Sequence, residues 1–182
     1  MLKVSRRAVA SAAAVLALGA GSLTWAATSA SAAPAKPAAP AYVPRPCNTS
    51  QLAAWVNADS ADGTAGTTYY HLDLTNTGGR ACWLYGWPGV SAVNWAGRQL
   101  GVPAVRRGPA HPGIVNVAPG GTAHALLGYV DVQLSPSCRP ATATFLRVYP
   151  PASRNARHAF FPLPVCTTRT WDLTIGPIQY GA

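Results

Sequence analysis

Short stretches in which apolar and polar residues alternate limit the fold of this chain more than any other feature. In residues 69–74, Tyr70, Leu72 and Leu74 share one face of an extended strand and the residues between them share the other. Beyond residue 47 no stretch sustains the i, i+3, i+4 spacing of an amphipathic helix for more than about two turns. The one helix we expect is a brief one over residues 51–56.

Further strands are predicted where β-branched and aromatic residues lie between turn residues. Asn76–Gly79 and Ala118–Gly121 have the residues of tight turns, the second with Pro and Gly in the order of a type II turn. Short strands separated by such turns are typical of a two-sheet antiparallel β-sandwich, with a barrel as the alternative. The further strands are expected at residues 83–85, 90–95, 114–117, 123–131, 142–149 and 171–175.

The composition excludes several classes of protein. A length of 182 residues allows one ordinary domain, and 49% hydrophobic with 10% charged residues is too apolar for a chain disordered throughout. All five acidic residues are aspartates, and none of them lies in a recognised catalytic or metal-binding pattern. We therefore predict no enzyme, no cofactor and no metal site.

The N-terminal region has the pattern of an export signal. A basic start is followed by an Ala/Leu/Val-rich stretch and by small residues up to Ala32, which predicts a signal peptide over residues 1–32, cleaved near Ala32, and an extracellular protein. Polar and glycine residues dilute the apolar stretch, so we expect no stable membrane span. Residues 33–46, rich in Pro and Ala, are predicted to be a linker, and residues 47–180 the folded domain.

Four cysteines in an exported domain of this size indicate disulfides rather than zinc ligands, because the usual spacing of zinc-binding pairs is absent. Three connectivities are possible. Pairing Cys47 with Cys82 and Cys138 with Cys166 is favoured, since each pair closes a local loop across neighbouring strands.

The segment from Asn76 to Val90, NTGGRACWLYGWPGV, resembles the signature of Domain of Unknown Function 4232, a family of exported actinobacterial proteins. Cys47, Cys138, Cys166 and other short pieces agree with it in order, so the resemblance covers residues 47–178. It implies an immunoglobulin-like β-sandwich stapled by Cys82, with Leu84 pointing inward. It also implies no assigned activity. Trp83, Tyr85 and Trp87 depart from the usual pattern of the family.

Trp83, Tyr85 and Trp87 alternate, so we expect their rings on one face of a strand, with Trp95 close by. Such a row can stack on the apolar faces of sugars. The alternative is that Trp83 and Trp87 cover the core under a loop.

The arginines form loose groups, Arg98 with Arg106 and Arg107, and Arg154 with Arg157 and His158. Removal of the signal peptide leaves 11 Lys and Arg against 5 Asp, a net charge of about +6. This charge could attract an anionic envelope polymer, phospholipid headgroups or an acidic protein, or could serve only solubility. Nucleic acid is not an expected partner, because no binding motif accompanies the charge.

Two other activities deserve a test. His71 and Asp73 share a strand face and would form a base and its orienting partner in a secreted hydrolase if a hydroxyl approached. The alternative, which we favour, is that they lie on a solvated sheet face. The rigid, proline-rich segment 162–166 would suit the reactive loop of an extracellular protease inhibitor. We favour a secreted, non-catalytic binding module for an envelope glycan, an anionic polymer or a protein, with Trp83, Tyr85, Trp87, Arg106 and Arg107 as its ligand-binding residues.

Overall fold

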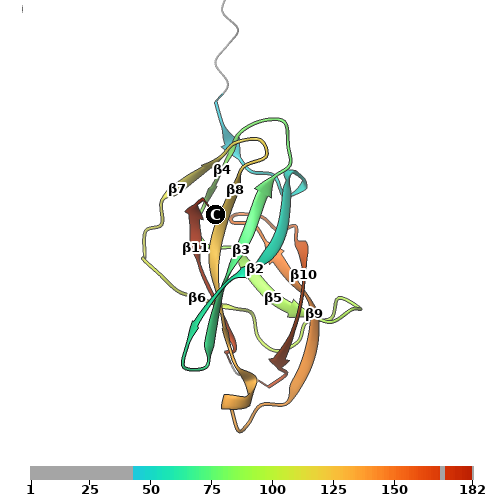
Figure 1. Ribbon diagram of the computed structural model, residues 1–182. Coiled ribbons are helices and arrows are strands. Elements are labelled where there is room, and N and C mark those ends of the chain that lie inside the picture. The colour runs from blue at the N-terminus through green and yellow to red at the C-terminus, as the bar shows by residue number, and fades with distance from the viewer. Residues whose placement is uncertain (1–42, 169–170, 182) are drawn as a thin grey trace, which may run out of the picture. The chain divides into compact units, whose positions relative to one another are not determined.

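Strands form almost all of the regular structure in the residues that the computed structural model describes, 43–168 and 171–181 (Figure 1). The predicted signal peptide, residues 1–32, and all but the last four residues of the predicted linker lie outside them. The elements are β1 (Arg45–Pro46), η1 (Thr49–Gln51), β2 (Leu52–Thr64), β3 (Thr67–Asn76), β4 (Cys82–Tyr85), β5 (Gly89–Val93), β6 (Val105–Arg106), β7 (Ile114–Val117), β8 (Thr122–Val130), η2 (Val132–Leu134), β9 (Pro140–Tyr149), β10 (Arg157–Cys166) and β11 (Leu173–Tyr180), where η denotes a 3₁₀ turn.

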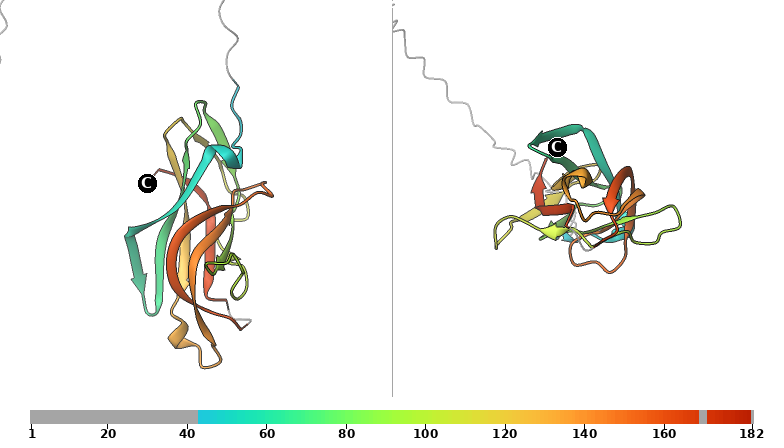
Figure 2. Two further views of the ribbon diagram at one scale, coloured as in Figure 1. Left: turned by 90° about the vertical axis from the view of Figure 1, so that its right-hand side faces the viewer. Right: turned by 90° about the horizontal axis from the view of Figure 1, so that it is seen from below.

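The strands form three sheets. The largest has the order β2-β3-β8-β11-β6, the second β10-β9-β5 and the smallest β1-β4-β7. Most neighbours are antiparallel, and only the two-residue strands β1 and β6 pair in parallel, with β4 and β11. Strands β5, β9 and β10 lie on one side of the large sheet in all three views (Figures 1 and 2). The fold is therefore all-β, as predicted, although the strands form three sheets and not two.

One hydrophobic core joins the sheets. Leu72, Leu74 and Leu127 come from the large sheet and Leu146 and Val148 from the second sheet, and none of these side chains is accessible to solvent. The small sheet closes one end with Cys82, Leu84, Val115 and Val117. Each sheet therefore buries one face and leaves the other face available.

The alternation predicted for residues 69–74 is confirmed on its inner face. Leu72 and Leu74 are fully buried and Tyr70 packs against the core. Leu84 is also buried, as the family resemblance implies. The turn at Ala118–Gly121 forms as expected, with the Gly121 amide donating to the Ala118 carbonyl at 2.9 Å.

The prediction of a helix over residues 51–56 is wrong. Only a 3₁₀ turn, Thr49–Gln51, precedes β2, and Asn48 caps it by accepting a hydrogen bond from the Ser50 amide. Leu52 is buried, and Ala54 and Val56 pack against the core. Every second residue therefore faces the core, which is the pattern of a strand. Pairing with β3 from Leu52 onward overrides the local helical preference.

β10 was not predicted from the sequence, because Pro162 and Pro164 argue against a strand. β10 lies at the edge of its sheet, so prolines there remove no hydrogen bond needed by a further strand. Both prolines are exposed, whereas Leu163 and Val165 between and after them are buried.

Both predicted disulfides are present. Cys47–Cys82 ties the start of the domain to β4, and Cys138–Cys166 ties the segment before β9 to the end of β10. In the chain-entropy account, closing loops of 35 and 28 residues restricts the unfolded chain by about 3.8 and about 3.6 kcal/mol.

Replacing Cys47 and Cys82 together by alanine should lower the free energy of unfolding by about 4 kcal/mol, because the unfolded chain regains the entropy of that loop. Urea denaturation of the oxidised proteins measures this loss. The matched control is the Cys138/Cys166 double variant, which should lose a similar amount. A loss below about 1 kcal/mol for both variants would contradict a stapling role.

Candidate functional site

Trp83, Tyr85 and Trp87 do not form the single row that was predicted. Trp83 and Tyr85 share the outer face of β4, where Trp83 is half-buried and Tyr85 is 47% exposed. β4 ends at Tyr85, and Trp87 lies beyond it with its Nε1 donating to the Arg107 carbonyl at 2.8 Å. Trp87 thus serves partly to hold the segment around residue 107.

The two predicted arginines, Arg106 and Arg107, differ in their surroundings. Arg106 is the last residue of β6 and pairs with Ile175 of β11. Arg107 follows the strand, and its amide donates to the Ile175 carbonyl at 2.8 Å. Both side chains are exposed, but only Arg107 lines a groove on the large sheet.

A contiguous aromatic surface occupies the outer face of the second sheet, and we call Trp95, Phe145, His158 and Phe160 the ring surface. Phe145 of β9 lies at its centre. The ring centroid of Phe145 is 5.7 Å from that of Trp95, 5.7 Å from that of Phe160 and 6.1 Å from that of His158. Trp95 is 79% exposed and Phe160 is 65% exposed. Trp95 and Phe160 thus each pack against Phe145 and face solvent.

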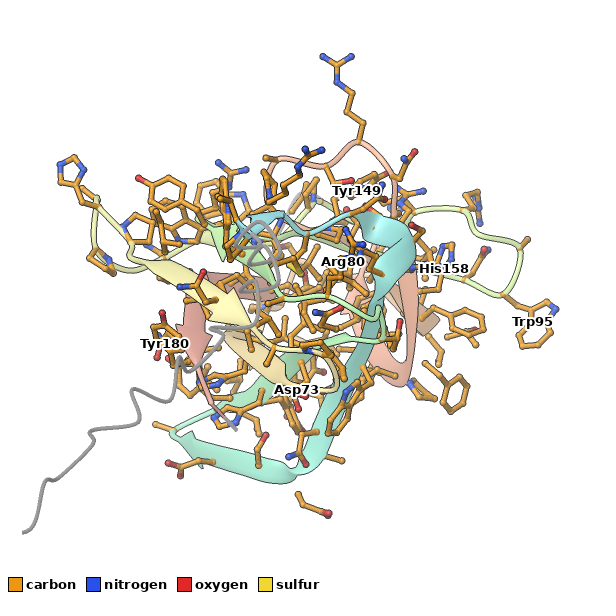
Figure 3. The ribbon with its side chains drawn as sticks, turned by 90° about the horizontal axis from the view of Figure 1, so that it is seen from above. Asp73, Arg80, Trp95, Tyr149, His158 and Tyr180 are labelled. Atoms are coloured by element: carbon orange, nitrogen blue, oxygen red, sulfur yellow. A yellow bond between two sulfur atoms is a disulfide. The ribbon has the colours of Figure 1, made fainter. Side chains whose placement is uncertain are left out.

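A hydrogen-bonded turn presents Trp95. Asn94 donates from its amide to the Arg98 carbonyl, and its carbonyl accepts from the Gly97 amide, each at 2.9 Å. The Asn94 side chain also accepts from the Arg98 amide at 2.9 Å. Figure 3 shows the Trp95 side chain projecting outward on the side where His158 lies. The ring is therefore held by a fixed backbone.

Polar groups border the ring surface. Arg147 of β9 is the cross-strand neighbour of His158, and it donates from Nη2 to Gln99 Oε1 at 2.8 Å. A depression of about 180 Å³ lies among Val93, Trp95, Phe145 and His158. The surface thus combines stacking area with fixed hydrogen-bonding groups and a shallow hollow.

The outer face of the large sheet carries a second cluster, around Asp73 (Figure 3). Its cross-strand neighbours are Trp55 on β2 and His124 on β8. The His71 and His124 rings stack with centroids 4.2 Å apart. Asp73 was predicted to lie on a solvated face, but its exposure is 0%, so that prediction is wrong. Its neighbours cover it.

The Asp73 carboxylate has an unusual environment. Neither of its oxygens accepts a hydrogen bond from the described part of the chain. Burial raises the pKa of this carboxyl above its ordinary value, and the nearby His71 and His124 partly offset the increase. Burying an unpaired carboxylate is costly, so the burial of Asp73 favours its neutral, protonated form.

This cluster lacks the arrangement of a hydrolase. Thr75, the hydroxyl two residues from Asp73, accepts from Trp55 Nε1 at 3.1 Å and bonds Thr122 at 2.9 Å. The Ser60 hydroxyl accepts from the His71 backbone amide and not from its ring. Within residues 43–168 and 171–181, no hydroxyl hydrogen-bonds the His71 ring. The required nucleophile and base are thus not paired.

Other predicted features have the following placements. No group of three or more His, Cys, Asp or Glu side chains in the described residues is arranged to hold a metal ion. None of the described helices is long and apolar enough to cross a membrane. The segment 162–166, expected to suit the reactive loop of an inhibitor, lies within β10, and its residues 163–166 pair with β9.

Sequence reasoning missed most of the ring surface. The sequence pattern places Trp95 only near Trp83, Tyr85 and Trp87. Phe145 was recoverable, because Leu146 and Val148 fix the inward phase of β9 and place Phe145 outward. Phe160 could not be assigned in this way, because the prolines of β10 argue against a strand there.

Comparisons with known proteins identify a family. A family model described as "Domain of unknown function (DUF4232)" matches residues 47–179. No curated protein and no solved structure matches the chain.

Asp73→Asn should change how stability depends on pH. A carboxyl whose pKa is raised by folding stabilises the native state below its ordinary pKa near 3.8 and loses that contribution as pH rises through the raised value. His71 and His124 are the titratable groups facing it. The difference in free energy of unfolding, wild type minus variant, should therefore fall as pH rises above about 4.

Chemical denaturation between about pH 4 and pH 8 measures this difference. The control is Asp59→Asn, an exposed aspartate, whose difference should stay flat. A flat difference for Asp73→Asn as well would show that the carboxyl titrates as if it were solvated.

Proposed function

The chain belongs to the family described as Domain of unknown function (DUF4232), and because that description assigns no activity, we propose a function from the geometry. This protein is an exported, non-catalytic binding module that holds a polysaccharide of the cell envelope on its ring surface. The observation that carries the proposal is the contact of three large rings, two of them mostly exposed, on one sheet face.

Sugars suit this surface for a physical reason. Their apolar C–H faces can lie on aromatic rings, which offer a large contact area with few rotatable bonds. An exposed apolar patch of this kind is uncommon unless something binds there. Trp95 and Phe160 provide the stacking area, and Phe145 beneath them fixes their spacing.

Hydroxyl groups at the edge of a stacked sugar need polar partners. His158, Arg147 and Gln99 lie beside the rings, and the bond from Arg147 to Gln99 fixes the orientation of both side chains. Such preorganisation lowers the entropy lost on binding. Exposed rings with fixed polar neighbours favour a glycan over a purely apolar partner.

The predicted export of the protein and its positive charge both fit a ligand in the cell envelope. Two disulfides are typical of proteins in an oxidising compartment outside the cytoplasm. The basic chain would be drawn to an envelope that carries anionic polymers, since opposite charges increase the encounter rate. Charge thus brings the domain to the envelope, and the ring surface determines what it holds.

Trp95→Ala should abolish most of the binding to purified envelope polysaccharide, because it removes the most exposed stacking ring. Affinity electrophoresis or calorimetry with the mature protein should show a loss of about 10-fold or more in affinity. Since stacking is not electrostatic, binding by wild type should persist at high salt.

The matched control is Trp171→Ala, because Trp171 is 69% exposed and lies outside the ring surface. This variant should bind as wild type does. Equal losses in the two variants, or no loss in Trp95→Ala, would refute the assignment.

A further inference from the structure

A groove of about 530 Å³ crosses the outer face of the large sheet, away from the ring surface. Its volume lies within the range of sites for small molecules, about 300–1,000 Å³. Strands β8 and β11 contribute Leu126, Val130, Thr174 and Gly176 to its lining. β3 contributes Thr67 and Tyr69.

The segment after β6 forms another part of the lining. The Arg107 amide bonds the Ile175 carbonyl, and the chain then passes through Gly108 and Pro109. Gly108 has φ +111°, and a Cβ there would lie 2.9 Å from Cδ of Pro177, so only glycine fits so closely. The Trp87 indole Nε1 donates to the Arg107 carbonyl at 2.8 Å. These contacts fix Arg107 at the groove.

Small residues allow close packing around the groove. β11 is irregular between Ile175 and Ile178, and Gly176 and Pro177 fill that interval. Gly128 lies opposite Tyr69, and a Cβ at Gly128 would come within 2.9 Å of the Tyr69 ring. The Tyr69 ring therefore lies close against the backbone of β8.

The lining is asymmetric in charge. Leu126, Pro109 and Pro177 are apolar, and Arg107 is the one charged residue among the described lining residues, none of which is acidic. Asp73, the carboxylate on the same sheet face, is completely buried and does not compete for the guanidinium. The side chain of Arg107 is exposed and bonds no acidic group in the described residues.

We propose that this groove binds a small amphipathic anion, a molecule with a non-polar body and a single carboxylate, sulfonate or phosphate head. The body lies against Leu126, Pro109 and Pro177, and the head pairs with Arg107. This site is independent of the ring surface and needs no polysaccharide. It would give the domain a second ligand class of its own.

The test uses two fluorescent probes of nearly the same shape, anionic anilinonaphthalene sulfonate and neutral N-phenylnaphthylamine. Wild type should bind the anionic probe at one saturable site, about 5-fold tighter than the neutral probe, since an exposed ion pair supplies about 1 kcal/mol. Arg107→Gln should reduce that ratio to about 1.

The matched control is Arg106→Gln, because Arg106 is adjacent and exposed but does not line the groove, and it should keep the ratio. Leu126→Ala should weaken both probes and keep the ratio. Circular dichroism and the melting temperature confirm that each variant is folded.

An unchanged ratio in Arg107→Gln, or equal losses in Arg106→Gln and Arg107→Gln, would overturn the proposal. Loss of both probes in Trp95→Ala would overturn it too, because the probes would then be binding at the ring surface. Failure of polysaccharide binding would leave the probe result intact, so the two proposals are separable.

Discussion

The burial of one face of each sheet in a shared core is the constraint on which the rest of the structure depends. Leu72 and Leu127 on one sheet, and Leu146 and Val148 on the other, are removed from solvent together. Because side chains alternate along a strand, this requirement also decides which residues face outward. The two disulfides add loop-closure entropy to that core but do not determine what the outer faces carry.

The two outer faces have different chemistry. On the second sheet, Phe145 packs against Phe160 and against Trp95, which a hydrogen-bonded turn presents. On the large sheet, His71 and His124 stack near the buried Asp73, and a groove elsewhere on that face has Arg107 in its lining. One face thus carries exposed aromatic rings, and the other carries a groove with a single arginine among its described lining residues.

The sequence predicted what alternation and turn chemistry control locally. The inward phase of β3, the Ala118–Gly121 turn and both disulfides follow from residue patterns and are confirmed. β2 was missed because its pairing with β3 overrides the local helical preference of its first residues. β10 was missed because its prolines argue against a strand, although they are tolerated at the edge of a sheet. The ring surface needed both β10 and the β5–β6 turn, which lie far apart in sequence, so Trp95 could not be joined to Phe160 in advance. Asp73 was assigned to the correct face, but its burial arises from His124 and Trp55 on neighbouring strands.

Oxidative footprinting with mass spectrometry tests the central claim most directly, because it reports the exposure of each side chain with and without ligand. With envelope polysaccharide added, oxidation of Trp95 and Phe160 should slow several-fold, while Trp171 and Tyr85, both exposed, should react as before. Protection of Tyr85 with no change at Trp95 would place the binding face on the small sheet and contradict this account.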